Sequence, residues 1–179
     1  WIKARNATAR HDIYDVVRGA KNSLSSQETS AEQASNIYGY LDSFDTDGFT
    51  VKTGTNNAGR TNQSGYNYVA FNWKAGGTAV SNTNGTITSS VSANPSAGFS
   101  IVSYTGTGAN ATVGHGLTLA APEMMIIKSR SDGAQDWGVY HTALGPTKWV
   151  RLNLTSASAT ASNVWNNTAP PSSGFSLGS

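Results

Sequence analysis

The three histidines are the first residues whose chemistry could serve a function. His11 lies in a polar stretch, His141 follows a strand-like block, and His115 lies between Gly114 and Gly116. No two of them have the spacing of a metal-binding pair on one helix, and no Gly-x-Ser-x-Gly nucleophile elbow accompanies them. We interpret His115 as a turn residue between conformationally permissive glycines, and keep it as a candidate contact for a ligand or partner.

Carboxylates gather in the stretch 42–48, DSFDTDG, which resembles the beginning of a calcium-binding loop. An EF-hand loop requires a glutamate at its twelfth position, and Asn56 stands there if Asp45 is the first residue. We predict instead that the stretch ends in a turn that leads into a strand at Phe49. Calcium binding is the alternative.

A glycosidase acid and nucleophile would need two carboxylates on opposite sides of a cleft, about 5 to 10 Å apart. The three glutamates, Glu28, Glu32 and Glu123, all lie in predicted loops. We therefore predict that the chain is not an enzyme and that it has no catalytic residue, metal site or cofactor.

The five tryptophans are candidates for sugar stacking or for protein interfaces. Trp1, Trp73, Trp137 and Trp149 fall in strand-like blocks, so we expect them in the interior or in contacts between domains. Trp165 lies outside any clear strand. We predict that Trp165 is exposed and is the best candidate for contact with a ligand or partner.

Composition limits the classes of function. The 179 residues are 37% hydrophobic but only 12% charged, with a formal net charge of +2 and scattered basic residues, so we expect no nucleic-acid partner. There is no cysteine, so neither a disulfide framework nor a cysteine-based zinc site can hold the fold. No apolar run is long enough to cross a bilayer and no signal peptide is recognisable, so we expect no membrane insertion.

Apolar and aromatic residues alternate with a period of two in short blocks separated by Gly, Asn, Ser and Thr, which predicts an all-β antiparallel sandwich. The block 66–73 carries aromatic residues on both faces and is expected to be a central strand. The segment 28–40 has a weak helical pattern and is either a helix or a loop. The predicted strands are 1–5, 13–17, 48–52, 66–73, 99–105, 124–129, 137–140, 149–153 and 174–177.

The sequence repeats itself. Residues 2–5, IKAR, reappear as 127–130, IKSR, displaced by 125 residues, and 48–51, GFTV, reappear as 174–177, GFSL, displaced by 126. The repeated segments occur in the same order in both places, which predicts a tandem duplication. We predict the back of one repeat in residues 1–76, a linker or hairpin in 77–98, and the front and middle of the next repeat in 99–179.

Four runs carry a resemblance to a known family: 1–20 (WIKARNATARHDIYDVVRGA), 42–51 (DSFDTDGFTV), 68–117, which begins YVAFNWKAGG, and 163–179 (NVWNNTAPPSSGFSLGS). They resemble the repeated units of marine phage and cyanophage virion proteins, which are similar to jelly-roll, concanavalin A-like domains. The resemblance implies a structural repeat of a tail fibre or similar appendage that contributes to host attachment. It implies a location in the extracellular virion after synthesis in the host cytoplasm, and partners among other virion subunits, including a homotrimer.

The alternative is a lectin-like module that recognises host surface glycans. No compact Asp, Asn and Glu set for paired calcium and manganese is present, so metal-dependent sugar binding is not expected. Aromatic residues clustered on one exposed loop face would favour glycan binding, whereas burial of all five tryptophans would favour architecture.

Overall fold

The computed structural model describes residues 1–179 and consists of β-strands with one short 3-10 helix, Pro95–Ala97. Every strand pair in its sheets is antiparallel, and the predicted all-β class is confirmed in an arrangement compatible with a β-sandwich. The chain divides into two compact units. Unit 1 comprises Trp1–Asn72 and Lys128–Trp137, and unit 2 comprises Trp73–Ile127 and Gly138–Ser179.

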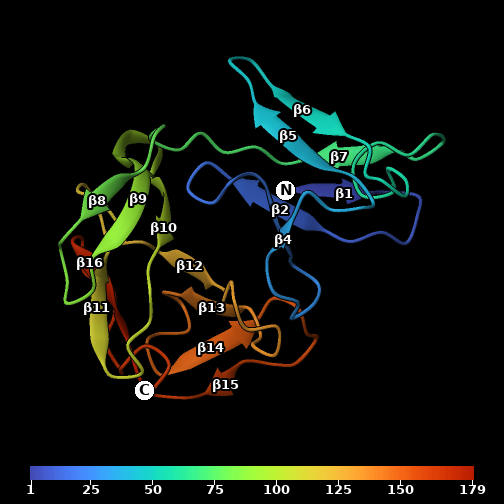
Figure 1. The fold of residues 1–179 in the computed structure, drawn as a ribbon. Coiled ribbons are helices and arrows are strands. Elements are labelled where there is room, and N and C mark those ends of the chain that lie inside the picture. Colours follow the sequence, from blue (N-terminus) through green and yellow to red (C-terminus); the bar gives the residue numbers. More distant parts are fainter. The chain divides into compact units, whose positions relative to one another are not determined.

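Unit 1 contains a five-stranded sheet in the order β4-β3-β2-β1-β7 and a separate hairpin, β5-β6, both visible in Figure 1. Its core consists of Ile2, Tyr14 and Leu41, against which Tyr68 and Ala70 pack. The strands are β1 (Ile2–Ala4), β2 (Asp12–Asp15), β3 (Gly19–Ser25), β4 (Gln33–Ala34), β5 (Tyr40–Phe44), β6 (Phe49–Lys52) and β7 (Tyr68–Ala70).

Two sequence-based expectations for unit 1 are resolved by these strands. The block 66–73 was expected to be central, but β7 is the last strand of its sheet, so this prediction is wrong. The reason is that Asn67 and Asn72 flank a short strand and Phe71 is left 54% exposed, so aromatic residues on both faces do not require cover on both faces. The segment 28–40 contains β4 and turns and no helix.

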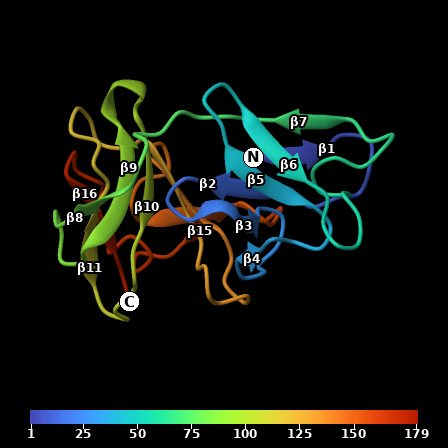
Figure 2. The same ribbon diagram turned by 45° about the horizontal axis from the view of Figure 1, so that its top comes forward.

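Unit 2 contains three sheets, in the orders β10-β9-β8, β11-β16 and β12-β13-β14-β15. Figures 1 and 2 both show β9 beside β10. Val113 is fully buried in the core with Ile87 and Phe175, and the ring of Tyr104 meets Phe175 edge-on at 6.0 Å. The strands are β8 (Val80–Asn82), β9 (Ser89–Asn94), β10 (Phe99–Ser103), β11 (Ala111–Gly114), β12 (Met124–Ile127), β13 (Gly138–His141), β14 (Lys148–Arg151), β15 (Ala159–Thr160) and β16 (Gly174–Leu177).

The sheets β1-β2-β3-β4 and β12-β13-β14-β15 have the same strand order and the same register. Five of the six pairs that join β1, β2, β3 and β4 have a counterpart in the second sheet, displaced by 126 residues in every case but Ile2, which is displaced by 125. These five pairs are Ile2↔Asp12, Asp12↔Ser25, Ile13↔Leu24, Asn22↔Ala34 and Ser23↔Gln33, and the sixth pair, Asp15↔Gly19, has no counterpart. Their counterparts are Ile127↔Gly138, Gly138↔Arg151, Val139↔Val150, Lys148↔Thr160 and Trp149↔Ala159.

The two compact units meet in the sequence between Asn72 and Trp73, and residues 77–98 contain β8 and β9, which pair as an antiparallel hairpin. The domain boundaries drawn from the sequence stay a prediction. No helical segment has the length and apolar character needed to cross a membrane.

Candidate functional site

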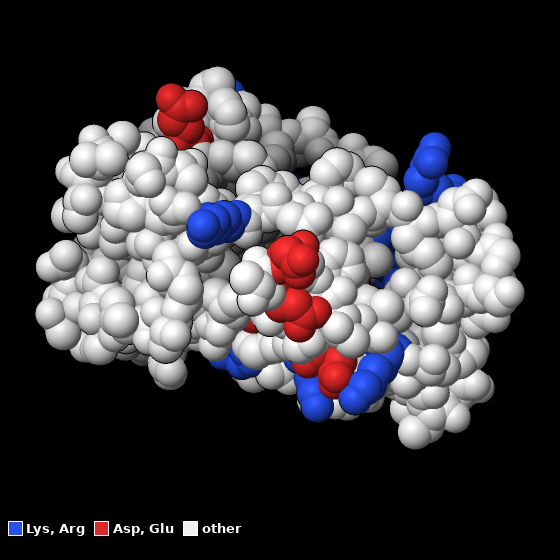
Figure 3. All heavy atoms as spheres, turned by 90° about the horizontal axis from the view of Figure 1, so that it is seen from above, with Lys and Arg blue, Asp and Glu red and all other residues white.

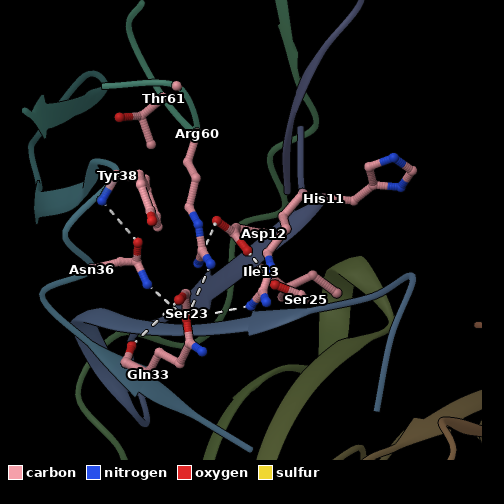
Figure 4. Close-up of polar contacts among 12 residues, drawn as sticks. His11, Asp12, Ile13, Ser23, Ser25, Gln33, Asn36, Tyr38, Arg60 and Thr61 are labelled. Carbon is pink, nitrogen blue, oxygen red and sulfur yellow. Dashed lines mark hydrogen bonds and ion pairs between the residues drawn. The ribbon is translucent and has the colours of Figure 1, made fainter. Parts of the chain in front are cut away.

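A buried carboxylate, Asp12, lies at the centre of the largest polar cluster of unit 1. It begins β2 and is fully buried, and its period-two position turns it to the same side as the buried Tyr14. Arg60, only 5% exposed, places Nη1 3.3 Å from Asp12 Oδ2. Ser25 Oγ donates to Asp12 Oδ1 at 2.6 Å. Both carboxylate oxygens therefore have partners, as Figure 4 shows.

Gln33 of β4 extends the cluster to the other side of Arg60. Its side-chain oxygen accepts hydrogen bonds from Arg60 Nη2 at 3.1 Å, from Asn36 Nδ2 at 2.6 Å and from Arg10 Nη1 at 3.4 Å. The backbone N–H of Arg60 also donates to the carbonyl of Tyr38 at 3.0 Å. These contacts fix the loop that carries Arg60 onto β2, β3 and β4.

Burial raises the pKa of Asp12, and the opposing effects of Arg60 and Ser25 do not cancel it. A raised pKa can mark a general acid or base. Here the carboxylate is completely buried and both oxygens are occupied, so no substrate atom can reach it. The cluster therefore positions the loop and strands of unit 1.

A second ionic group surrounds Glu32. Its Oε2 lies 3.0 Å from Arg18 Nη1, and Arg18 Nε is in turn 2.5 Å from Asp15 Oδ2. Arg130 contacts both carboxylate oxygens of Glu32, with Nη2 2.7 Å from Oε1 and Nε 3.0 Å from Oε2. This two-point geometry is the strongest form of arginine–carboxylate pair. Burial alone would raise the pKa of Glu32, but the hydrogen bonds from Arg130 and Arg18 outweigh it and lower the pKa.

The contact between Glu32 and Arg130 is part of a docked loop, Lys128–Trp137. The carbonyl of Arg130 accepts a hydrogen bond from the backbone N–H of Glu32 at 2.9 Å. Trp137 is 4% exposed, and its indole N–H donates to the carbonyls of Ser25 at 3.1 Å and Glu28 at 3.0 Å. We call Ser25, Glu28, Glu32, Arg130 and Trp137 the loop-docking site. It binds polypeptide through an anchored indole, an ion pair and backbone groups, and it has no reactive group aimed at a cavity.

The two predicted contact residues, His115 and Trp165, are both buried in unit 2. His115 is 3% exposed, its Nδ1 accepts from the N–H of Leu117 at 3.0 Å, and its Nε2 lies 3.1 Å from the carbonyl of Pro171. The interpretation of His115 as a turn residue agrees with these bonds. That it contacts a ligand or partner stays a prediction.

The predicted exposure of Trp165 is wrong, because the side chain is only 2% exposed. Its indole N–H donates to the carbonyl of Lys148 at 3.1 Å and its ring meets Tyr140 edge-on at 5.8 Å. A turn with Asn166 and Asn167 in the left-handed region follows the indole, so a residue outside any strand is still packed inside. Any contact with a ligand or partner remains a prediction for this residue.

The other tryptophans divide between interior and surface. Trp137 is buried as expected, and Trp1 and Trp149 are half-buried. Trp73 is 56% exposed, so it does not lie in the interior, and its expected role in a contact between domains stays a prediction. It lies beyond the end of β7 and stacks on Phe99 with ring centroids 6.2 Å apart.

The carboxylates of the stretch 42–48 belong to the β5-β6 hairpin. Asp45 closes the turn by donating its N–H to the carbonyl of Gly48 at 2.9 Å, which confirms the predicted turn. Its carboxylate accepts hydrogen bonds from Ser43 at 2.7 Å and from Thr50 at 2.8 Å. Asp42 pairs with two lysines of neighbouring strands. No group of three or more His, Asp or Glu residues is arranged to hold a metal ion.

Sequence reasoning did not identify the Asp12 cluster or the loop-docking site. A signal for Asp12 existed, because strand alternation places it with Tyr14 on the inward side, where a carboxylate needs a partner. Nothing in the sequence indicated that this partner was Arg60, because 47 residues separate the two. The role of Trp137 as an indole donor to two carbonyls was equally hidden.

Comparison with known proteins identifies a family. Residues 1–179 match the model of a family described as a domain of unknown function, DUF7483, and the chain belongs to that family. No curated protein matches the chain, and no solved structure matches it.

Proposed function

We propose, for this member of the DUF7483 family, that the chain is a structural repeat of a bacteriophage virion protein, in a tail fibre or similar appendage that contributes to host attachment. The resemblance of its sequence runs to marine phage virion repeats supports this role. So does an all-β structure in which a buried polar cluster holds a loop against the strands of unit 1.

The observation that carries the proposal is the register shared by the two four-stranded sheets. Five pairings of the first sheet recur in the second at one constant displacement along the chain, and the one-residue difference at Ile2 falls in the loop between the first two strands. Register is strongly specified wherever one face of a sheet is buried, so a constant step requires matched side-chain patterns in both copies. Tandem duplication explains this step, and stacked repeats in which each unit contacts its neighbours build extended proteins.

The loop-docking site links the two copies in this proposal. Lys128–Trp137 is the loop between the first two strands of the second copy, and it docks on the end of β3 and on the segment between β3 and β4 of the first. An anchored indole and a two-point ion pair supply the specificity of such a joint.

The surface agrees with an architectural role. Figure 3 shows a face made mostly of residues other than Lys, Arg, Asp and Glu, with an acidic group near its centre that adjoins basic side chains. Neither a basic stripe for nucleic acid nor a strongly acidic face is visible there. A neutral surface of short turns suits a protein that stands outside the cell among other copies of itself.

Cryo-electron microscopy of particles that carry the protein, with antibody against the recombinant chain, tests this proposal. We expect the label on a symmetric projection from the particle. Label within the shell contradicts the attachment role, and absence from purified particles contradicts the virion role altogether.

One observation favours the alternative, a lectin-like module for host glycans. Trp73 presents an exposed ring stacked on Phe99, the arrangement of a small aromatic platform. A glycan array with the recombinant chain and with Trp73→Ala separates the two functions. Binding that is lost in Trp73→Ala supports the lectin alternative, and absence of any binding leaves the architectural role alone.

A further inference from the structure

β12 is an edge strand with an unusual amount of exposed apolar surface. It is the first strand of the order β12-β13-β14-β15, so the edge that faces away from β13 has no strand beside it. Met124 and Ile126 are 51% and 39% exposed. An open edge with exposed large apolar side chains is a template for pairing with another strand, and proteins usually cover or charge such edges.

The counterpart of this edge in unit 1 is covered. β1 occupies the place that β12 has in the second sheet, and β7 pairs with the side of β1 that faces away from β2. The pairing is Ile2↔Ala70, Lys3↔Val69 and Ala4↔Tyr68. Two reciprocal backbone hydrogen bonds between Trp1 and Phe71, both 2.9 Å, extend it by one residue.

Exposure differs between the two edges in the direction that a missing strand predicts. Ile2 is 4% exposed and Ala4 is fully buried beside β7. Their counterparts, Ile127 and Ser129, are only half-buried. The two edges have similar sequences, because Ile-Lys is followed by a small residue and Arg at both 2–5 and 127–130.

We propose that the open edge of β12 binds a strand of the β7 type, which takes the place of β7 in the second copy of the repeat. In the register of unit 1, the Ala70 position of that strand lies opposite Ile127 and the Phe71 position lies opposite Ile126. The added strand covers the exposed side chains of β12 and continues the hydrogen-bonded sheet by strand addition. This inference shares the duplication with the proposed function and is independent of the virion role.

A chain extended with its own β7 sequence tests the pairing. Residues 64–73 are appended after Ser179 through a Gly/Ser linker as long as residues 54–63, because Gly178 and Ser179 occupy the places of Lys52 and Thr53. The linker contains no counterpart of Arg60. None is needed, because the position of its partner Asp12 is occupied by Gly138 in the second sheet. Hydrogen exchange then compares the β12 amides in the extended and original chains.

We expect the Ile126 amide to exchange at least tenfold more slowly in the extended chain, and an appended scrambled sequence to have no effect. The chain has no cysteine, so a disulfide can report the register without background. Ile126→Cys is paired with Cys at the appended Phe71 position, which is directly opposite, and in the control with Cys at the appended Ala70 position, which faces the other side of the sheet.

Preferential crosslinking of the directly opposite pair, together with slower exchange, supports the proposal. Unchanged exchange, equal crosslinking of both pairs, or displacement of the native β7 from β1 overturns it. A negative result here leaves the location of the protein in a particle untouched. Conversely, absence from particles does not alter the pairing measured in the extended chain, so the two proposals fail separately.

Discussion

Asp12 shows how one buried charge orders a large part of unit 1. Its carboxylate receives Arg60 and Ser25, and Arg60 also reaches Gln33, so one ion pair joins three strands and a loop. Replacing such a pair by apolar residues is often neutral, whereas removing one partner leaves an uncompensated buried charge. Removing one member of the ion pair should therefore destabilise the fold more than replacing both members by apolar residues.

Arg60→Ala should lower the free energy of unfolding by about 3–5 kcal/mol at neutral pH, measured by urea denaturation. Burial raises the pKa of Asp12 while Arg60 lowers it, so loss of the guanidinium raises that pKa further. A raised folded-state pKa means that stability falls as pH rises from the ordinary carboxyl pKa to the folded-state value. The loss should therefore be smaller near pH 4 than at pH 7.

The control for this pH dependence is Asp12→Asn/Arg60→Ala, which has no carboxyl group to titrate at this position. The double variant should show the same loss relative to the single variant Asp12→Asn at both pH values, because neither of these chains has the carboxyl group that titrates in the wild type. If Arg60→Ala alone is equally destabilised at pH 4 and pH 7, Asp12 is not the group that suffers from the missing partner.

The pKa of Glu32 is shifted in the opposite direction to that of Asp12. Burial opposes ionisation, but Arg130 and Arg18 outweigh it and hold the pKa below the ordinary value, so its contribution is present above that value and is lost as pH falls through the folded-state pKa. Glu32→Gln should cost about 1 kcal/mol at pH 7, the upper range for a partly exposed ion pair, and almost nothing at about pH 2. Urea denaturation at the two pH values measures this, and a loss that persists at the lower pH points to packing instead of charge.

At the scale of elements, the loop Lys128–Trp137 depends on the indole of Trp137. Trp137→Phe keeps an aromatic ring but removes the donor to the carbonyls of Ser25 and Glu28. Two lost hydrogen bonds predict a destabilisation of about 1–3 kcal/mol and faster hydrogen exchange throughout the loop. Trp165→Phe is the matched control, because it removes an indole bond to Lys148 in unit 2 and should leave the exchange of this loop unchanged. Equal effects of both variants contradict a local anchoring role.

The side chains of a strand determine whether it could be predicted from the sequence. β12 and β14 contain Met124, Ile126 and Trp149, whose apolar character marks a strand in any register. β3 and β9, with sequences GAKNSLS and SSVSAN, show almost no alternation, because serine hydroxyls and asparagine amides take inward positions there and find hydrogen-bond partners. Such strands are held by the backbone ladder and by their neighbours, and local pattern does not reveal them.

At the scale of the whole molecule, the sequence predicted a duplication, which stays a prediction, but it did not predict the long-range contacts. The motif around Ile2 and Ile127 is a short continuous segment, and its residues are nearly identical in the two places. The loop-docking site joins Ser25 and Glu28 to Trp137, 112 and 109 residues away, and no periodicity encodes that approach. Trp165 is buried and Trp73 is exposed, the reverse of what their predicted positions outside and inside a strand indicated. Their exposure depends on how the turns beside them pack, which the strand pattern does not predict.

The duplication predicts that corresponding turns are interchangeable. Asp15 Oδ1 accepts the N–H of Val17 and a glycine with φ +95° follows at Gly19, while His141 Nδ1 accepts the N–H of Ala143 and Gly145 has φ +73°. The two turns have the same length and the same displacement of 126 residues as the strands that they join. Transplanting residues 15–19 into positions 141–145 should therefore keep the fold of unit 2.

We expect the Tm of this transplant to stay within about 4 °C of the parent, which corresponds to about 1–2 kcal/mol in a chain of this size. The control moves the same five residues one position toward the C-terminus, into positions 142–146, so that an arginine occupies position 145 in the left-handed region at a cost of about 1–3 kcal/mol. Differential scanning calorimetry compares the two. Because only a shared register makes position 145 the correct place for the transplanted glycine, equal Tm values for transplant and control would count against the duplication.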